Sequence, residues 1–342
     1  MQLHPARLAR AAALALALTP LGAGAVAGAA LAADDGPPPP PKAAGGAKVE
    51  TVGQGVPTPT EFAFAADGTV FVAAAGAEDG SAPGGLFVLK DGRATAVPDA
   101  PRSVFGVAAK GDVVYLSSGP QILAAKGWDG TRFATIEPIF TGPKKFTGFN
   151  GIAVGPNGRI YAGVTMAEQG DHRKVAAPYA QSVISMSTSG KQVKTVARGL
   201  RQPWMIAFSP GNPNPLVTAL GQENLGRRQP PDYVIRAKQG QDYGFPTCNW
   251  SKPKACKGKA KPIALLPAHS SPMGIGVLGG KLYLALFTGT GRGPQVVSLP
   301  LKGGSKTTPV LSGFAAPVVA LGAHDGYIYA GDLTGAIYRV KA

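Results

Sequence analysis

One strand pattern recurs six times along the 342-residue chain: a short apolar strand, a turn of glycine and polar residues, and a second apolar strand. A third apolar strand follows in each unit, and most units add a fourth. The turns are marked by Gly68, Gly111, Gly158, Asn212, Gly280 and Gly326, which lie 43, 47, 54, 68 and 46 residues apart. A period of about 40 to 50 residues with several strands per unit is typical of β-propellers.

The last unit ends too early to contain a fourth strand, because its third strand covers 336–340 and the chain stops at Ala342. The segment 48–53 has the pattern of that missing strand and no earlier strand to pair with. Pairing the two segments would leave no open sheet edge where the ring closes. We therefore predict an all-β, six-bladed β-propeller over 49–342, whose last blade is completed by the N-terminal strand near Val49.

Composition agrees with this fold class. The chain has 48 Gly and 32 Pro, too many for long helices, because each glycine costs about 1 and each proline about 3 kcal/mol in a helix interior. Hydrophobic residues make up 44% and charged residues 15%, which allows a sizeable core and argues against bulk disorder.

The N-terminus has the features of a secretory signal peptide. Two arginines precede the apolar run 11–18, and an Ala-x-Ala cleavage site lies at 30–32. A retained membrane anchor is the alternative, but proline and glycines interrupt the apolar stretch. We predict a signal peptide over 1–32, a Pro/Gly-rich disordered linker over 33–48, and a secreted, extracellular protein with no membrane span after cleavage.

Basic charge is concentrated in one region. Cleavage after Ala32 removes two arginines and no acidic residue, which leaves a net charge of +13, and 227–261 alone carries +7. A nucleic-acid binder would interleave aromatic residues for base stacking, and 251–262 contains none. We therefore predict no nucleic-acid partner, and a solvated Lys-rich loop that attracts an anionic cell-surface polymer.

The two cysteines, Cys248 and Cys256, lie in a Cys/Lys-rich insertion predicted over 247–268. An even cysteine count in an exported protein favours a disulfide. A metal site is the alternative, but two cysteines alone do not complete a tetrahedral set.

Four segments resemble the glucose/sorbosone dehydrogenase family: Gly-Leu-Arg-Gln-Pro-Trp at 199–204, Pro-Pro-Asp at 230–232, Gly-Gln-Asp-Tyr-Gly-Phe-Pro-Thr-Cys at 240–248 and His-Ser-Ser-Pro-Met-Gly at 269–274. Characterised members are secreted six-bladed propellers that hold pyrroloquinoline quinone (PQQ) over a calcium ion and oxidise sugars or related aldoses. The resemblance implies a small-molecule sugar or glycan as the partner, and PQQ and calcium as cofactors.

The resemblance also implies site residues. Arg201 matches the arginine that meets a quinone carboxylate, although a blade-junction salt bridge with Asp232 would account for it equally well. The other residues that the resemblance places around the cofactor are Gln202, Asp232, His269 and Arg292. Gly221 and Gln222 match the segment whose backbone carbonyls bind calcium, a suitable ligand type for a hard cation.

The chain departs from the family pattern at the catalytic base. The family has a histidine before the third-blade turn, whereas the corresponding stretch here begins at Thr147 and contains none. A threonine hydroxyl cannot accept a proton near neutral pH as imidazole does. His172 is a substitute candidate in the following loop. The family's His-Gly-Ser segment in the fifth blade reads Thr-Gly-Thr at 288–290.

Three functions remain open on the sequence: a PQQ-dependent sugar or aldose oxidoreductase, a non-catalytic glycan- or protein-binding propeller, and a calcium-dependent lactonase-type hydrolase. The hydrolase would use Glu61, Asn150 and Asp332, which lie near inner strands or the loops that follow them. Carboxylate and amide oxygens converging on one axial ion would suit calcium.

Overall fold

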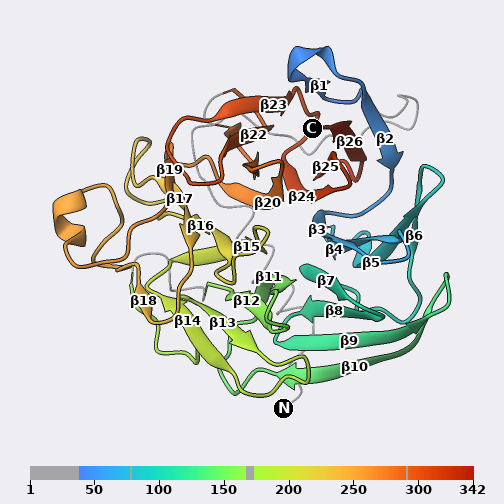
Figure 1. The fold of residues 1–342 in the computed structure, drawn as a ribbon, viewed down its shortest axis with the longest axis horizontal. Coiled ribbons are helices and arrows are strands. Elements are labelled where there is room, and N and C mark those ends of the chain that lie inside the picture. Colours follow the sequence, from blue (N-terminus) through green and yellow to red (C-terminus); the bar gives the residue numbers. More distant parts are fainter. Residues whose placement is uncertain (1–37, 78, 167–172, 290–291) are drawn as a thin grey trace.

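Six antiparallel sheets are arranged around a common axis and form a six-bladed β-propeller (Figure 1). The computed structural model describes residues 38–77, 79–166, 173–289 and 292–342. The predicted signal peptide therefore lies outside the described residues.

Each blade begins with its innermost strand and proceeds outward. Blade 1 contains β3 (Pro59–Phe64), β4 (Val70–Gly76), β5 (Pro83–Lys90) and β6 (Arg93–Ala96). Blade 2 contains β7 (Gly106–Lys110), β8 (Val113–Ser118), β9 (Gln121–Trp128) and β10 (Phe133–Thr141). Blade 3 contains β11 (Phe149–Val154), β12 (Ile160–Val164), β13 (Ser182–Met186) and β14 (Lys194–Arg198).

The second half of the ring repeats this order. Blade 4 contains β15 (Gln202–Ala207), β16 (Leu216–Leu220), β17 (Asp232–Arg236) and β19 (Ala264–Leu266). Blade 5 contains β20 (Pro272–Leu278), β21 (Lys281–Leu286), β22 (Gln295–Pro300) and β23 (Thr308–Ser312). Blade 6 contains β24 (Val318–His324), β25 (Tyr327–Asp332), β26 (Ile337–Lys341) and the N-terminal strand β2 (Val49–Gly53).

The predicted closure of the ring is confirmed. Strand β2 pairs antiparallel with β26, with Val49 opposite Val340 and Thr51 opposite Tyr338. The Glu50 carboxylate accepts a hydrogen bond from Arg339 Nε at 2.8 Å across the same ladder. Strand β2 also contacts β5 and β6, so one N-terminal segment completes blade 6 and touches blade 1 (Figure 1).

Apolar side chains fill the spaces between neighbouring blades. Between blades 6 and 1, Phe62, Val72, Ala320 and Ile337 belong to one buried cluster. Strands whose side chains are buried on both faces read as apolar runs, which is why the strand pattern was visible in the sequence.

The inner strands share an irregularity near their first residues. Register shifts occur in β3, β11, β15, β20 and β24. A β-bulge removes a backbone group from the ladder, and bulges are common beside functional sites. In β11, the Ile152 N–H beside the register shift donates to the Glu61 carboxylate of blade 1.

The linker and the insertion contain more structure than their composition indicates. Within the predicted linker, β1 (Lys42–Ala43) pairs with the outer strand of blade 5, and the 3₁₀ helix η1 (Ala44–Gly46) follows. The insertion contains the 3₁₀ helix η2 (Pro253–Cys256), and its C-terminal part supplies β19, the outer strand of blade 4. Just before it, β18 (Gln241–Asp242) pairs parallel with β14.

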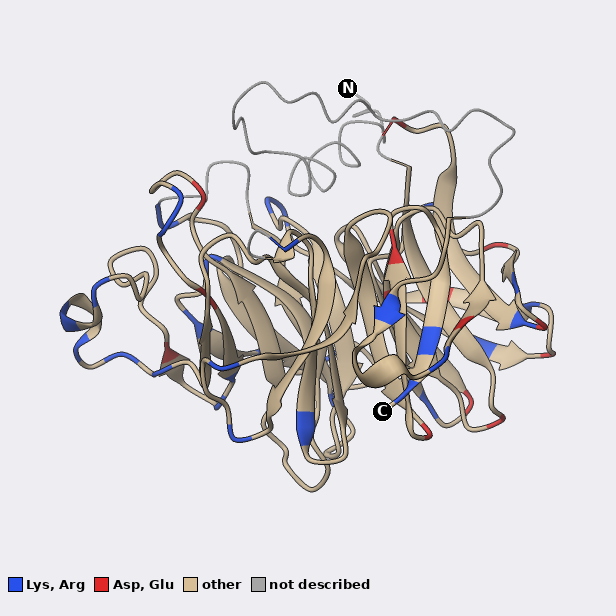
Figure 2. Ribbon diagram, turned by 90° about the horizontal axis from the view of Figure 1, so that it is seen from above, with Lys and Arg blue, Asp and Glu red and all other residues tan. Residues whose placement is uncertain are grey.

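Neither 3₁₀ helix of the described chain is long or apolar enough to cross a membrane. The insertion projects from one side of the ring and carries several lysines, shown in blue at the left in Figure 2.

Candidate active site

The residues implied by the family resemblance gather on one face of blades 4 and 5. Arg201 precedes β15, Gly221 follows β16, Asp232 opens β17 and His269 precedes β20. Because consecutive strands of a blade are antiparallel, the start of the first strand, the end of the second and the start of the third share one face. The alternation of strand direction thus brings together residues that are far apart in the chain.

Asp232 holds the loops of this face together. Its Oδ1 accepts a hydrogen bond from the Gly221 backbone N–H at 2.7 Å, and its Oδ2 accepts one from the Ser271 N–H at 2.8 Å. The Ser270 hydroxyl lies 3.3 Å from Oδ2. Burial raises the pKa of Asp232, while these hydrogen bonds and the nearby Arg201 charge oppose the rise. The carboxylate therefore fixes the candidate calcium-binding segment relative to blade 5.

Arg201 is buried and lies opposite a carboxylate. Its Nη2 is 3.8 Å from Oε1 of Glu223, and its side chain is 6% exposed. Asp232, the partner considered in the sequence analysis, interacts with Arg201 electrostatically. The structure thus adds Glu223 as an ion-pair partner that the sequence did not indicate. A buried guanidinium keeps its charge, so it can attract an anionic ligand to this face.

Gln202, the neighbour of Arg201, is buried with both amide atoms unsatisfied. It is 2% exposed, and neither Nε2 nor Oε1 has a hydrogen-bond partner among the described residues. A buried amide without partners costs free energy, so such a group in a folded protein needs an explanation. A ligand that supplies a donor and an acceptor at this point would satisfy it.

We expect Gln202→Met to stabilise the protein by about 1 kcal/mol or more, because it removes an unsatisfied buried amide at nearly constant volume. The matched control is Gln295→Met. Gln295 is also buried, but its Nε2 donates to the Gly289 carbonyl at 3.2 Å, so its replacement should destabilise. Urea unfolding measures both. A loss of stability in Gln202→Met equal to that of the control would show that the Gln202 amide has partners in solution.

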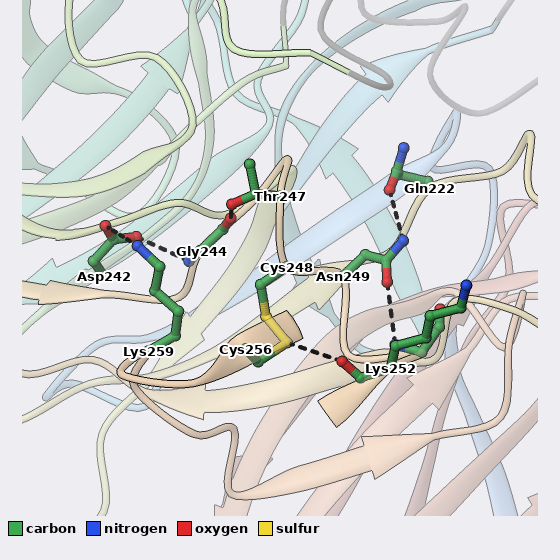
Figure 3. Close-up of a disulfide and its surroundings, with 10 residues drawn as sticks. Gln222, Asp242, Gly244, Thr247, Cys248, Asn249, Lys252, Cys256 and Lys259 are labelled. Carbon is green, nitrogen blue, oxygen red and sulfur yellow. Dashed lines mark hydrogen bonds and ion pairs between the residues drawn. A yellow bond between two sulfur atoms is a disulfide. The ribbon is translucent and has the colours of Figure 1, made fainter. Parts of the chain in front are cut away.

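The disulfide-bonded insertion supports the candidate calcium-binding segment. Cys248 and Cys256 form the predicted disulfide. The next residue, Asn249, donates from Nδ2 to Oε1 of Gln222 at 3.2 Å (Figure 3). Lys259 pairs with Asp242 at 3.1 Å at the base of the insertion. The insertion is therefore anchored at both ends and orients the Gln222 side chain.

His269 lies in the same group of loops. Its Nε2 is 3.0 Å from the Gly226 carbonyl oxygen, and its own carbonyl accepts a hydrogen bond from the Thr288 hydroxyl. Arg292 lies in the loop after Thr288 and is exposed, and its backbone N–H donates to Gly289 at 3.0 Å. Thr288, which stands where the family's His-Gly-Ser segment has its histidine, thus contacts the loop of His269.

The region of the missing family histidine is occupied by a chain of hydrogen bonds. The Thr147 hydroxyl donates to the Thr165 carbonyl at 2.5 Å, and the Thr165 hydroxyl donates to Oδ1 of Asn150 at 2.9 Å. Asn150 Nδ2 in turn donates to the Pro203 carbonyl at 2.7 Å and links blade 3 to blade 4. His172, the substitute candidate, lies outside the described residues.

Glu61 of blade 1 joins three consecutive blades. Its Oε2 accepts hydrogen bonds from Val107 N at 2.8 Å and Ile152 N at 3.1 Å, in blades 2 and 3. A Cβ at Gly151 would collide with Met205 and lie 3.1 Å from Oε1 of Glu61, so a glycine is needed where these inner strands approach. Burial raises the pKa of Glu61 well above its ordinary value.

Asp332 is buried in blade 6, where its Oδ1 accepts from the Thr334 backbone N–H at 3.0 Å. Glu61 and Asn150 lie close together, but no hydrogen bond of the described residues joins Asp332 to either. No group of three or more His, Cys, Asp or Glu with metal-binding geometry occurs in the described residues. Both ends of the Asn150 amide are already hydrogen-bonded.

Sequence reasoning missed several contributors to the site, chiefly Glu223, Asn249 and Ser271. Glu223 directly follows the candidate calcium-binding segment, and that proximity was the only available signal. Asn249 is adjacent to a cysteine, and Ser271 acts through its backbone, which leaves no trace in residue type.

Three solved structures share the architecture of this chain. The PQQ-bound aldose sugar dehydrogenase of Streptomyces coelicolor matches with a TM-score of 0.68 and 19% identity, covering 88% of this chain and 99% of that one. A putative glucose dehydrogenase of Thermus thermophilus matches with a TM-score of 0.70 and 19% identity, covering 86% and 100%. The holo PQQ domain of pyranose dehydrogenase from Coprinopsis cinerea matches with a TM-score of 0.68 and 15% identity, covering 88% and 97%.

The propeller has a sugar-dehydrogenase-like fold. At these identities the likeness concerns the fold and leaves the activity to be argued from the site. No family model matches the sequence, and no curated protein matches it significantly.

Proposed function

We propose that this protein is a secreted PQQ-binding oxidoreductase acting on a sugar or related aldose. The observation that carries the proposal is the buried Arg201 guanidinium next to the unsatisfied Gln202 amide. PQQ is a planar acid with several carboxylates and carbonyls, so its groups complement a cation and an amide in need of partners. When bound, PQQ would supply the oxidant that accepts two electrons from the sugar.

The residues of this chain would bind and orient the cofactor. Arg201 would hold a carboxylate and Gln202 a carbonyl or ring N–H, and the backbone carbonyls of Gly221 and Gln222 would bind calcium. Asp232 would keep that segment in place through the Gly221 N–H. His269 and Arg292 would approach from blade 5.

The proton acceptor differs from that of the family pattern. The Thr147 hydroxyl is engaged with Thr165 and has no basic atom, so it cannot take the proton from the sugar hydroxyl. His172 is the proposed replacement. The disulfide supports an oxidising, extracellular location.

A second candidate is a non-catalytic propeller that binds an anionic cell-surface polymer through the Lys-rich loop. The absence of the family histidine at Thr147 and the basic insertion favour it. A dye-reduction assay over a sugar panel, with His172→Ala as the test variant, separates the two functions. Reduction that requires His172 would support the oxidoreductase.

The cofactor proposal is tested by titrating the purified protein with PQQ in the presence of calcium. We expect saturable binding that Arg201→Gln weakens roughly ten- to hundredfold, the effect of removing a charge-assisted hydrogen-bond donor. Glu223→Gln should strengthen binding, since Glu223 competes with the quinone carboxylates for Arg201.

The matched control is Arg198→Gln, which removes the same charge from an exposed side chain on the outer strand of blade 3. Its affinity for PQQ should equal that of the unchanged protein. Absence of saturable binding, or equal losses in Arg198→Gln and Arg201→Gln, would overturn the proposed cofactor.

A further inference from the structure

A recess lies beside the candidate active site. Its volume is about 610 Å³, and it is lined by the loop between β16 and β17, over 225–231, and by Trp250 and Ser251 of the insertion. The loop and the insertion meet only in the folded chain. We refer to this recess as the insertion pocket.

The insertion pocket is basic. Arg227 and Arg228 are the only charged residues among its described lining, which includes no carboxylate. Both are exposed, and in the described parts of the chain neither guanidinium has an acidic partner. Each guanidinium is a planar set of donors that can bind a carboxylate through two parallel hydrogen bonds.

Trp250 provides an independent sign of a ligand. It is 8% exposed, and its indole Nε1–H has no acceptor among the described residues. The Ser251 hydroxyl is likewise buried without a partner in the described chain. The Trp250 backbone has φ of 63°, a left-handed conformation that is rare for a bulky residue and recurs at binding sites. Two neighbouring residues that line the recess thus carry a buried donor without a partner among the described residues.

The walls of the pocket are held from both sides. Cys248 anchors the insertion two residues before Trp250, and Asn249 hydrogen-bonds Gln222 at 3.2 Å (Figure 3). On the opposite wall, the Gly226 carbonyl is 3.0 Å from His269 Nε2. This contact joins the pocket wall to a residue of the candidate active site, so a ligand in the pocket would lie next to that site.

We infer that the insertion pocket binds a carboxylate-bearing saccharide, such as a uronic acid residue of an oligosaccharide. The guanidinium groups of Arg227 and Arg228 hold the carboxylate. The Trp250 indole and the Ser251 hydroxyl, which are shielded from solvent in this structure, turn toward the ligand and donate to ring or hydroxyl oxygens. Leu225 and Pro231 provide apolar wall for the CH faces of the sugar. The inference does not depend on quinone binding.

The chemistry favours an acidic sugar over a nucleotide. A nucleobase needs an open aromatic face for stacking, and the Trp250 side chain is buried. The recess is also larger than an inorganic anion requires. A saccharide of one or two rings uses both the anionic subsite and the remaining volume.

The test is calorimetric titration of the purified protein with trigalacturonate at about 0.15 M salt, where long-range attraction is screened beyond ~8 Å. Neutral galactotriose is the comparison ligand. We expect saturable binding of trigalacturonate, at least roughly tenfold tighter than that of galactotriose. The double variant Arg227→Ala/Arg228→Ala should lose roughly tenfold or more, since two charge-assisted contacts are removed.

The matched control is Lys254→Ala/Lys257→Ala, which removes the same charge from exposed residues on or next to η2, outside the pocket. It should bind trigalacturonate as the unchanged protein does. Trp250→Phe, which removes the indole donor and retains an aromatic ring, should weaken binding of trigalacturonate at a temperature where thermal unfolding shows the variant to be fully folded. Equal losses in the arginine and lysine variants would show diffuse attraction, and equal binding of both trisaccharides would show a neutral-sugar site; either result overturns the inference.

Discussion

A protein shortened to begin at Gln54 is expected to lose most of its stability, whereas one that begins at Lys48 is expected to fold normally. Both versions lack β1 and η1. Of the described elements, the two versions differ in β2, which is missing from the version that begins at Gln54. Without β2 the backbone of β26 loses its ladder partner, and Tyr338 and Val340, now 1% and 2% exposed, are uncovered.

The expected loss in the free energy of unfolding is large because ladder hydrogen bonds and buried apolar contacts are lost together. Each ladder hydrogen bond contributes about 0.5 to 1.5 kcal/mol, and each uncovered apolar side chain about 1.5 to 3 kcal/mol. A total on the order of 5 kcal/mol or more approaches the whole net stability of a typical domain, about 5 to 15 kcal/mol. Blade 1 loses a neighbour as well, since β2 contacts β5 and β6.

Urea unfolding followed by circular dichroism compares the two shortened proteins. A synthetic peptide covering 48–56 should restore cooperative unfolding to the version that begins at Gln54, because the vacant edge of β26 accepts a strand in trans. If both versions unfolded at the same urea concentration, β2 would not be the closure of the ring.

Replacement of Glu61 is expected to have the second largest effect. Glu61→Leu leaves the Val107 and Ile152 N–H groups buried without an acceptor, at about 1 to 3 kcal/mol each, or roughly 2 to 6 kcal/mol in total. Glu61→Gln retains a side-chain acceptor of the same length and should cost much less at neutral pH. Thermal or urea unfolding of the two variants measures the difference.

The pH dependence of the free energy of unfolding distinguishes a buried carboxyl group at position 61 from a neutral amide. Burial raises the folded-state pKa of Glu61 well above its ordinary value of 4.5. The folded protein therefore binds a proton more tightly than the unfolded chain does. This contribution to stability is fully present below pH 4.5 and is lost as pH rises through the folded-state pKa. Glu61→Gln removes this dependence.

The free energy of unfolding of Glu61→Gln minus that of the unchanged protein should therefore increase from pH 4.5 upward and level off above the folded-state pKa. Asp232 and Asp332 have pKa values raised by burial too, and the comparison cancels their contributions because both proteins contain them. Parallel stability curves for the two proteins would mean that Glu61 stays ionised in the fold.

The structure of the lysine-rich insertion could be predicted from the sequence only in part. Its cysteines, its charge and its position after the third strand of blade 4 were evident from the sequence, and the disulfide was predicted correctly. Its C-terminal part, read as loop, supplies β19 instead. A three-residue strand at a blade edge is too short to show a period, so only its pairing with β17 identifies it.

The amino-acid sequence alone determined the ring: six copies of an apolar strand pattern, and a partner for the last strand near Val49. Those features are local, since the apolar strand runs and the turn residues lie within each segment. The tertiary structure alone decided which groups meet at the face of blades 4 and 5. At that face Arg201 pairs with Glu223, and the Gln202 amide has no hydrogen-bond partner within the described chain. Elsewhere in the ring, Glu61 accepts hydrogen bonds from two other blades. Such contacts follow no period, because they depend on how loops from different blades converge once the ring has closed.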